Sequence, residues 1–196
     1  MARVIGDISM SLDGFVTGPD PGPEQGLGRG GEALHTWAFE GDPADREILA
    51  ETAGTTGVVI MGRRLFDVID GPHGWTDEVG YGATEAATPP VLVVTRRPPA
   101  TMRLSPDRFT FVVDGIGSAV SKGRAMAEER DVVVMGGAAV IRGALEQNLL
   151  DQLRLHLAPV LLGAGTPLFA DGSARALRQV HVRATGHATH LTYQMD

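Results

Sequence analysis

Short, wholly apolar runs recur through the middle of the chain and set its pattern. They occupy residues 58–61, 91–95, 109–113 and 132–135. A run of this length without polar alternation is typical of a strand that is buried on both faces of a parallel sheet. Amphipathic segments follow most of these runs, and we interpret them as helices starting near residues 63, 117 and 138. Strands that alternate with helices predict an α/β fold.

A further helix is predicted over residues 43–53, ahead of the first apolar run. Asp42 is a suitable N-cap because its side chain can accept hydrogen bonds from free amides of the first turn. Pro43 suits the first helical position, where no backbone donor is needed. Ile48 and Leu49 supply the apolar stripe of this helix.

The two ends of the chain differ from its middle. Residues 3–12 are predicted to form a strand that runs into a loop. Near the C-terminus, residues 152–162 alternate apolar and polar side chains, as do residues 179–184 and 189–195. The Gly186-His187 pair between the last two segments suits a hairpin turn. We therefore expect these three segments to form an antiparallel edge, ending in a hairpin, that is added to an otherwise mostly parallel sheet.

Residues 18–31 hold six glycines and three prolines, which excludes a regular helix or strand. Such a segment is either a mobile surface loop or an ordered lid over a site. It follows only one predicted strand, so a domain linker is not expected there. No repeat of 20–50 residues is found, and the whole chain, 1–196, is interpreted as a single domain.

Composition narrows the classes of function. The formal net charge is −7, which argues against a nucleic-acid or membrane-surface binder. There is no cysteine, which excludes disulfides, thiolate metal sites and a cysteine nucleophile. No apolar run reaches the roughly 18 residues of a membrane span. The N-terminus lacks a signal-peptide pattern, so we expect a cytoplasmic protein.

Three of the predicted strands end in loops that suit an anion. Gly136-Gly137 lets the backbone approach a ligand closely, and the next helix presents free amides. Gly62 is followed by two arginines, and Thr95 by another two. Tight turns that need glycine, and arginines that are merely solvated, are the alternatives. Together, however, three such loops at one sheet edge describe a cleft for a long polyanionic ligand.

Other chemistry finds little support in the sequence. The six histidines show no metal-ligand spacing, and we expect no metal site. Neither a nucleophile elbow nor a Walker-type phosphate loop is present. Carboxylates near the predicted cleft include Asp45, which we take as the candidate proton donor. Its place in the first helical turn also has a structural explanation, because the helix dipole favours an acid there.

Four segments in order resemble a known family. They are Ser9-x-Ser11-Leu12-Asp13-Gly14-Phe15-Val16, Val-Ile-Met-Gly-Arg-Arg-Leu-Phe (59–66), Val-Val-Met-Gly-Gly-Ala-Ala-Val-Ile (133–141) and Leu-Ala-Pro-Val-Leu-Leu-Gly-x-Gly-x-Pro-Leu-Phe (157–169). This pattern resembles the dihydrofolate reductase-like superfamily, and more closely the stand-alone relatives of the riboflavin-biosynthesis (RibD C-terminal) reductase domain. The resemblance implies a three-layer α/β fold with a mixed, mostly parallel sheet and helices on both faces. It also implies NADPH as cofactor.

The resemblance also implies roles for individual residues. Gly62, Arg63, Arg64 and Leu65 would contact the pyrophosphate and the adenosine phosphate. Thr95, Arg96 and Arg97 would hold the 2′-phosphate and ribose. The pyrophosphate would be wrapped by Gly136, Gly137, Ala138, Ala139, Val140 and Ile141. Ser9, Val16 and Thr17 would edge the nicotinamide, residues 18–31 would replace the lid loop, and Asp45 falls near the family's substrate-binding carboxylate.

These expectations favour an NADPH-dependent reductase acting on a small heterocyclic or ribosylaminopyrimidine-type substrate. The protein's part would be to position cofactor and substrate and to exclude water. The alternative is a non-catalytic nucleotide- or antifolate-binding module of the same fold, because no residue is an unambiguous catalytic acid. A homodimer is expected, because the terminal hairpin could pack across a two-fold axis and the resembled family tends to form such dimers. No nucleic-acid or membrane partner is expected.

Overall fold

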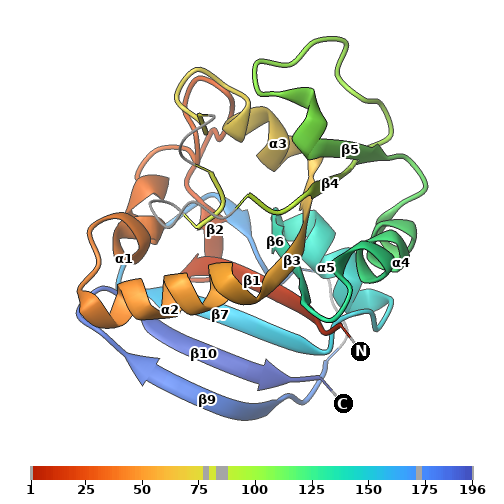
Figure 1. Cartoon of the computed structure of the whole chain (residues 1–196). Helices are drawn as coiled ribbons and strands as arrows, with labels where there is room; N and C mark the ends of the chain where they lie inside the picture. Colours follow the sequence, from red (N-terminus) through yellow and green to blue (C-terminus); the bar gives the residue numbers. More distant parts are fainter. Residues whose placement is uncertain (1, 77–79, 83–87, 171–173, 196) are drawn as a thin grey trace.

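An eight-stranded mixed sheet forms the centre of the computed structural model, which describes residues 2–76, 80–82, 88–170 and 174–195 (Figure 1). Its strand order is β5-β4-β3-β6-β1-β7-β10-β9. The first six strands in this order are parallel, and β10 and β9 are antiparallel to their neighbours. The strands are β1 (Val4–Ser11), β3 (Thr56–Gly62), β4 (Val91–Val94), β5 (Phe109–Val112), β6 (Asp131–Gly136), β7 (Gln152–Ala158), β9 (Arg178–Ala184) and β10 (Thr189–Gln194).

Helices lie on both faces of this sheet, as the strand–helix alternation predicts (Figure 1). On one face Val58 and Ile60 of β3 pack with α4 and α5 in one apolar core. On the other face Val59 and Met61 pack with α3 in a second core. The helices are η1 (Gly31–His35), α1 (Thr36–Phe39), α2 (Pro43–Thr55), α3 (Arg63–Ile69), η2 (Pro106–Arg108), α4 (Ile116–Ala127) and α5 (Ala138–Glu146).

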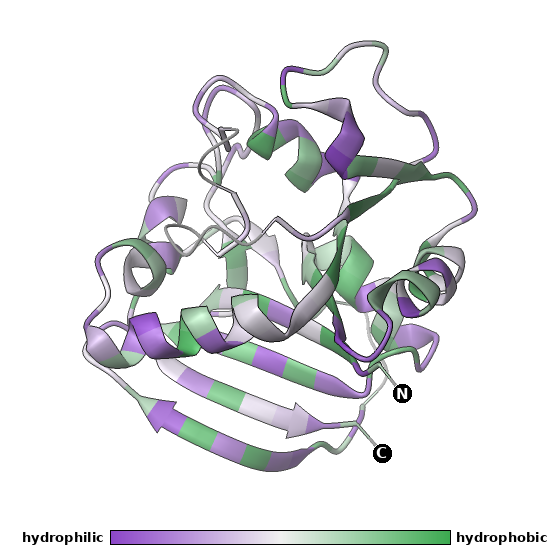
Figure 2. Cartoon of the chain, viewed as in Figure 1, coloured by the Kyte–Doolittle hydropathy of each residue, from purple (hydrophilic) through white to green (hydrophobic). Residues whose placement is uncertain are grey.

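The hydropathy of the strands changes across the sheet. All seven residues of β3 are buried, whereas β9 is almost wholly exposed along its length. Figure 2 shows the same contrast, with purple and green residues alternating along β9. Central strands covered on both faces need apolar side chains throughout, and an edge strand with one open face does not. The apolar runs and the segments at 179–184 and 189–195 therefore predict the right places in the sheet. The expectation for residues 152–162 is wrong, because β7 lies between β1 and β10 and runs parallel to β1, where both of its faces are largely covered.

The face of the sheet that carries α3 becomes polar beyond β6. Along β1, Asp7 and Ser9 point to this face, and His156 of β7 is in register with Ser9. His190 of β10 is in turn in register with His156. Ser9, His156 and His190 are each no more than 4% exposed. This buried polar area lies under α1 and the start of α2.

A small second sheet accompanies the 18–31 segment. Strands β2 (Phe15–Thr17) and β8 (Thr166–Pro167) pair antiparallel beside the end of β1. Asp13 fastens this region, because its carboxylate accepts hydrogen bonds from the Ser11 hydroxyl and from the amides of Leu162 and Gly163. The Ser11 hydrogen bond leads the effects that hold the pKa of Asp13 below its usual value. The 18–31 segment contains one isolated bridge, Gly22 to Gly26, and no named strand.

Element ends differ from the sequence prediction by a few residues. The predicted strand over 152–162 ends at Ala158, ahead of Pro159, which cannot donate to a sheet ladder. The helix predicted to start near residue 138 begins at Ala138 and ends at Glu146, and Asn148 beyond it adopts a positive φ of 53°. No helix in the described ranges has the length and hydropathy that crossing a membrane requires.

Candidate functional site

The three anion-friendly loops meet at one edge of the sheet. Strands β4, β3 and β6 are neighbours and parallel, so their carboxyl ends lie side by side. Gly62 is in register with Val94, the residue before Thr95, and Met61 is in register with Gly136. Ligands of open α/β sheets bind beyond this edge. The structure thus brings together the three loops that the sequence singles out.

Glycine is needed at this edge for close packing and for an unusual backbone. A Cβ on Gly62 would lie 2.7 Å from Cγ2 of Val140, so the β3 loop and α5 are in direct contact. Gly136 has a φ of 129°, a region that disfavours other residues, and its peptide bond to Gly137 is cis. A Cβ on Gly137 would meet nothing within 4 Å. The backbone at Gly137, just before α5, therefore has open space beside it, and we call this space the Gly137 ledge.

Two of the predicted ligand contacts also hold the loops in shape. The Arg63 guanidinium donates to Asp67, one turn later in α3, and to the carbonyl of Arg97. The Thr95 hydroxyl donates to the same carbonyl and accepts from the Arg97 amide. Asp67 offsets the unfavourable placement of a positive charge at the start of a helix. Arg63 and Thr95 thus link the β3 and β4 loops.

Arg64, Arg96 and Arg97 have a different environment. All three are exposed, and within the described ranges their side chains form no ion pair or hydrogen bond. Guanidinium groups that are free at a sheet edge can form forked hydrogen bonds with phosphate oxygens. Their assignment to phosphate groups of a cofactor stays a prediction.

The residues expected at the nicotinamide lie at the end of β1 and in β2. Ser9 is buried and its hydroxyl accepts a hydrogen bond of 3.0 Å from the Trp37 indole. Val16 is 5% exposed. The Thr17 hydroxyl hydrogen bonds to that of Thr166 across the small sheet. Since β1 is next to β6, Ser9 lies close along the sheet edge to Gly136.

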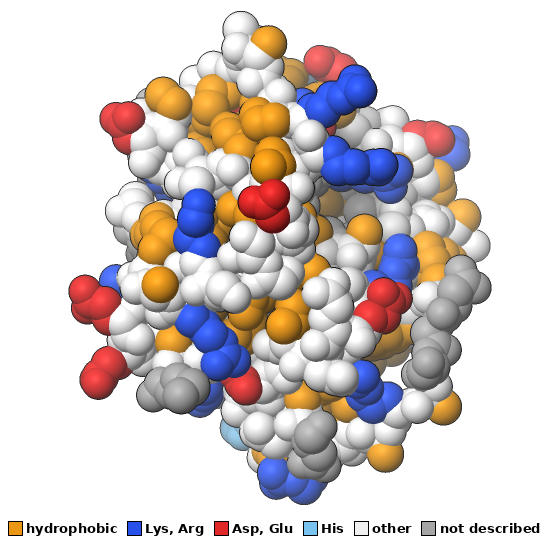
Figure 3. Space-filling view, turned by 90° about the vertical axis from the view of Figure 1, so that its right-hand side faces the viewer, with side chains coloured by type: hydrophobic (Ala, Val, Ile, Leu, Met, Phe, Trp, Pro, Cys, Tyr) orange, Lys and Arg blue, Asp and Glu red, His pale blue; other side chains and the backbone are white. Residues whose placement is uncertain are grey.

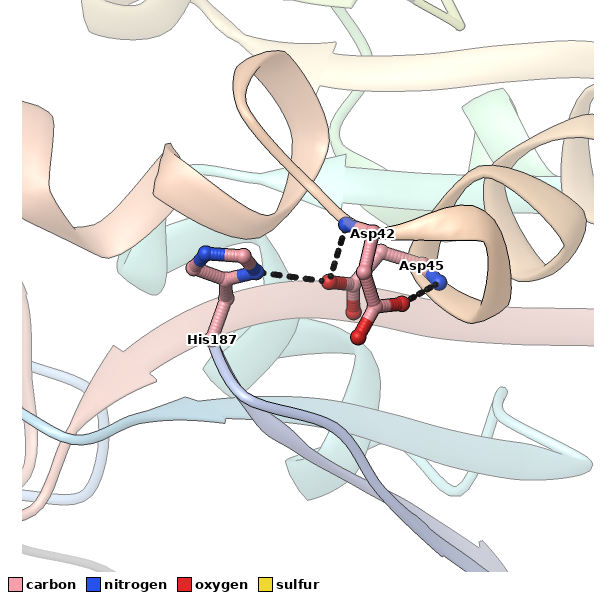
Figure 4. A group of neighbouring side chains, drawn as sticks. All are labelled: Asp42, Asp45 and His187. Carbon is pink, nitrogen blue, oxygen red and sulfur yellow. Dashed lines mark hydrogen bonds and ion pairs between the residues drawn. The ribbon is translucent and has the colours of Figure 1, made fainter.

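Asp45 lies wholly inside the protein. The structure confirms Asp42 as the N-cap of α2, and its carboxylate accepts from the amides of Ala44 and Asp45. The Asp45 carboxylate completes a capping box with the Asp42 amide and also binds His187 (Figure 4). Its other oxygen binds His190. Burial opposes its ionisation, but hydrogen bonds from Thr185, His190 and His187 hold the pKa of Asp45 below its usual value.

Asp45 begins a chain of buried polar groups. His190 Nε2 lies 2.9 Å from Asp45 Oδ1, and His190 Nδ1 lies 2.7 Å from His156 Nδ1. His156 Nε2 lies 2.9 Å from Asp7 Oδ1. The Trp37 ring stacks on His156 at a centroid distance of 4.2 Å and meets His190 edge-on. The sequence analysis predicts neither histidine as a functional residue, although the strand alternation does place His156 opposite the leucine face of its strand.

Asp42, Asp45 and His187 also place one potential metal-ligating atom each within 4.8 Å of one another (Figure 4). The two carboxylates come from the first turn of α2, and His187 from the turn between β9 and β10. Helix capping explains the positions of both carboxylates, because each accepts hydrogen bonds from backbone amides of the first turn. The arrangement therefore needs no metal ion to account for it.

A cavity of about 370 Å³ lies against the 18–31 segment. Its other walls include Glu32 and His35 of η1, Phe39 of α1 and His73 beyond α3. Nδ1 of His35 is buried without a hydrogen-bond partner within the described ranges. Burial, with a contribution from His156, lowers the pKa of His35 to about 4. This histidine is therefore neutral at physiological pH.

The surface seen in Figure 3, the right-hand side of Figure 1, carries Lys and Arg in several separate groups between hydrophobic patches. A surface that binds nucleic acid presents its basic residues as one continuous patch or stripe. This face does not have that arrangement.

Comparison with known proteins places the chain in a family. The RibD C-terminal domain family matches residues 2–191. The chain belongs to the RibD C-terminal domain family. Its sequence is 26% identical over 188 residues to the uncharacterized protein YyaP of Bacillus subtilis (strain 168), covering 92% of this chain and 88% of that protein.

Solved structures of similar proteins share the fold, which is dihydrofolate reductase-like. A putative riboflavin biosynthesis protein from Shewanella sp. PV-4 superposes with a TM-score of 0.70 and 20% identity, over 99% of this chain and 98% of that one. RibD from Acinetobacter baumannii (form 2) gives a TM-score of 0.69 at 17% identity, over 99% of this chain but only 58% of that chain. The family resemblance and the predicted fold class are thereby confirmed.

Proposed function

We propose that the protein is an NADPH-dependent reductase that transfers a hydride to a small heterocyclic or ribosylaminopyrimidine-type substrate. The observation that carries this proposal is the meeting of the Gly62, Thr95 and Gly136-Gly137 loops at one sheet edge in a RibD C-terminal domain. A similar structure from Thermotoga maritima is named a diaminohydroxyphosphoribosylaminopyrimidine deaminase/5-amino-6-(5-phosphoribosylamino)uracil reductase. This chain covers 56% of that protein at a TM-score of 0.63.

The residues at the edge fit a dinucleotide that carries a 2′-phosphate. The open ledge at Gly137 leaves room for a pyrophosphate beside the first amides of α5. Arg96 and Arg97 are free to bind a phosphate monoester, and Arg64 a second anionic group. Bound NADPH supplies the hydride. The remaining residues 62–65 and 136–141 hold and orient it, with Ser9, Val16 and Thr17 at the nicotinamide end.

The protein's own contribution is to orient the acceptor and to exclude water. Residues 18–31 cover the cavity next to η1, and Phe39 adds an apolar wall against which a flat ring can pack. Reduction of a C=N or C=O bond also consumes a proton. Asp45 is the proposed participant in its supply, and because its side chain is buried and its pKa is lowered, it acts through its histidine partners.

The cavity also favours one substrate class over another. Among the described residues, its lining contains the carboxylates of Glu24 and Glu32 and no Lys or Arg. A phosphorylated substrate would meet negative charge there, whereas a neutral or weakly basic heterocycle would not. We therefore propose that an unphosphorylated ring compound is reduced in preference to its phosphoribosyl counterpart.

The test is NADPH oxidation by the purified protein against three acceptors. These are 5-amino-6-(5-phosphoribosylamino)uracil, its dephosphorylated form and dihydrofolate. The proposal predicts turnover with at least one acceptor, and faster turnover of the dephosphorylated uracil than of the phosphorylated one. NADPH binding without oxidation of any acceptor would instead favour a nucleotide-binding module, an alternative that the burial of Asp45 supports.

We also propose that the protein forms a homodimer through the sheet end that carries β9. Val180 and Val182 of this edge strand are 43% and 48% exposed. Val182 is in register with Leu191 of β10, so the two side chains share one face of the sheet. Exposed apolar side chains on an edge strand favour association. Light scattering of Val180→Lys/Val182→Lys should give the monomer mass, and the native chain twice that mass; a native monomer contradicts the proposal.

A further inference from the structure

Five side chains form one continuous hydrogen-bonded chain through the polar part of the sheet. In order they are His187, Asp45, His190, His156 and Asp7, and every link is between 2.7 and 3.0 Å long. The links join the β9–β10 turn, α2, β10, β7 and β1. Capping of α2 requires only Asp42 and Asp45, so it does not explain why the hydrogen-bonded chain continues from the β9–β10 turn to β1.

The number of hydrogen atoms in the inner part of this chain follows from its geometry. The three links from Asp45 through His190 and His156 to Asp7 each need one hydrogen. Ionised carboxylates only accept, and two neutral imidazoles bring two N–H groups. The contact between the two Nδ1 atoms at 2.7 Å is then left as two facing lone pairs. All three links are satisfied only when the group holds one additional proton.

The surroundings set how tightly this additional proton is held. Burial and the neighbouring His156 lower the pKa of His190, and Asp45 opposes that effect. Burial opposes ionisation of Asp7, but His156 and Arg154 hold the pKa of Asp7 below its usual value. The two carboxylates thus oppose the effect of burial without outweighing it, so the pKa of His190 stays below its usual value. The charged and titratable groups that face the two histidines are Asp7 of β1, His35 of η1, Asp45 of α2, Arg154 of β7 and His187 of the β9–β10 turn.

The two ends of the chain differ in access. The His187 side chain is 34% exposed, whereas those of His190 and His156 are only 5% exposed and lie under the Trp37 ring. At the inner end, Asp7 Oδ2 is buried and has no hydrogen-bond partner within the described ranges. Asp7 lies two residues before Ser9 on the same face of β1. The chain therefore connects solvent with a carboxylate oxygen two residues along β1 from Ser9, which is expected to edge the nicotinamide.

We propose that these five residues store one proton and deliver it to the reduced substrate, with His187 as the solvent entrance and Asp7 as the delivering group. The proposal deepens the proposed reductase function and rests on it. Asp45, His190 and His156 are positioning residues in this scheme, since they act through Asp7.

The step balances with one nicotinamide cofactor and one proton from water. Hydride adds to the carbon of a C=N or C=O bond, whose π electrons move to the heteroatom. The stored proton passes from His156 Nε2 to the ionised Asp7 carboxylate, and the heteroatom takes it from the carboxyl group so formed. The histidine pair regains a proton through Asp45 from His187, which takes one from water. The nicotinamide leaves oxidised.

The test is NMR of the cofactor-free protein with ¹⁵N-labelled histidine, so it does not depend on reductase activity. Because the pKa of His190 is lowered, we expect the additional proton on the acid side of the ordinary histidine range, as a single far-downfield signal bonded to an Nδ1 of the His156–His190 pair that is lost in His190→Gln. In His187→Gln the signal should remain, but its exchange with water should slow at least tenfold. Asp45→Asn should slow the exchange similarly. His181→Gln, at an exposed position of β9, is the matched control and should leave the signal and its exchange unchanged.

Two results would overturn the proposal. One is a pair of neutral imidazoles with no proton on either Nδ1 at any pH at which the protein is folded. The other is a shared proton whose exchange with water is the same in the native chain and in His187→Gln. His187 is the better site for this comparison than Asp45, because its side chain is partly exposed and does not cap a helix. Failure of NADPH to bind refutes the reductase function without altering either NMR result.

Discussion

The Nδ1 atoms of His156 and His190 face each other at 2.7 Å, and each ring's other nitrogen binds a carboxylate. This pairing makes the histidines, rather than Asp45 alone, the centre of proton supply in the proposed reduction. The same pair gives the first prediction.

His190→Gln should lower kcat for the best acceptor about tenfold or more, because general acid catalysis contributes on the order of 10² or more to rate. The KM for NADPH should change little, since His190 is not among the residues expected to bind it. In the native chain, kcat should fall as pH rises and the shared proton is lost, and this limb should be absent in the variant. An unchanged pH profile would exclude the pair from proton supply.

Acid sensitivity should depend on His35. Its pKa is about 4 in the folded protein and near 6.5 when unfolded, so the unfolded chain binds more protons between these values. Folding stability should therefore fall as pH drops from 6.5 to 4, by up to about 3 kcal/mol for this group. His190, whose pKa is also lowered, adds a loss of the same sign. His35→Gln should reduce the slope of urea-unfolding free energy against pH in this window.

The carboxylates act in a lower window and serve as an internal control. Asp7, Asp13 and Asp45 have lowered pKa values, so their stabilisation is present above about pH 4 and is lost below it. The dependence of the unfolding free energy on pH between 6.5 and 4 should therefore come mainly from the histidines. If His35→Gln leaves that slope unchanged, His35 is not neutral in the folded protein.

Gly62 and Gly137 form a matched pair of substitutions at the sheet edge. Gly62→Ala places a Cβ 2.7 Å from Val140, and overpacking of this kind costs about 1–3 kcal/mol of stability. Gly137→Ala meets no atom of the protein within 4 Å, but its methyl group would fill the ledge proposed for the pyrophosphate. Thermal unfolding should distinguish Gly62→Ala, and NADPH titration should distinguish Gly137→Ala. If Gly137→Ala binds NADPH with the affinity of the native chain, the pyrophosphate does not bind at this ledge.

Arg96 and Arg97 should determine the preference for a phosphorylated cofactor. Charge-assisted hydrogen bonds contribute about 1.5–3 kcal/mol each, so the double alanine variant should lose about tenfold or more in NADPH affinity. NADH affinity should change by less than about threefold because NADH lacks the 2′-phosphate. Arg178→Ala, exposed on β9, is the control for lost surface charge. Equal losses for both cofactors would contradict the assignment of these two arginines.

The order of helices and strands could be predicted because buried strands consist of apolar residues, which the sequence shows directly. The apolar run at Val58–Met61 is wholly buried in β3, and Asp42-Pro43 begins α2 as its capping chemistry indicates. The meeting of the Gly62, Thr95 and Gly136 loops also follows once the sheet is parallel. These features depend on local propensity and on one topological rule.

The chain of buried polar groups could not be predicted in the same way. His156, His190 and Asp45 are far apart in sequence, and their contacts depend on strand register and on how α2 crosses the sheet. Alternation along residues 152–162 suggests that His156 lies opposite the buried leucines. Only the packing of Trp37 over it reveals that this second face is buried as well.

The most direct test of the central claim is calorimetric titration of the purified protein with NADPH and with NADH. We expect micromolar affinity for NADPH and at least tenfold weaker binding of NADH, because the free guanidinium groups of Arg96 and Arg97 have no 2′-phosphate to bind in NADH. Absence of binding by both cofactors, at concentrations up to the millimolar range, would contradict the proposed cofactor site.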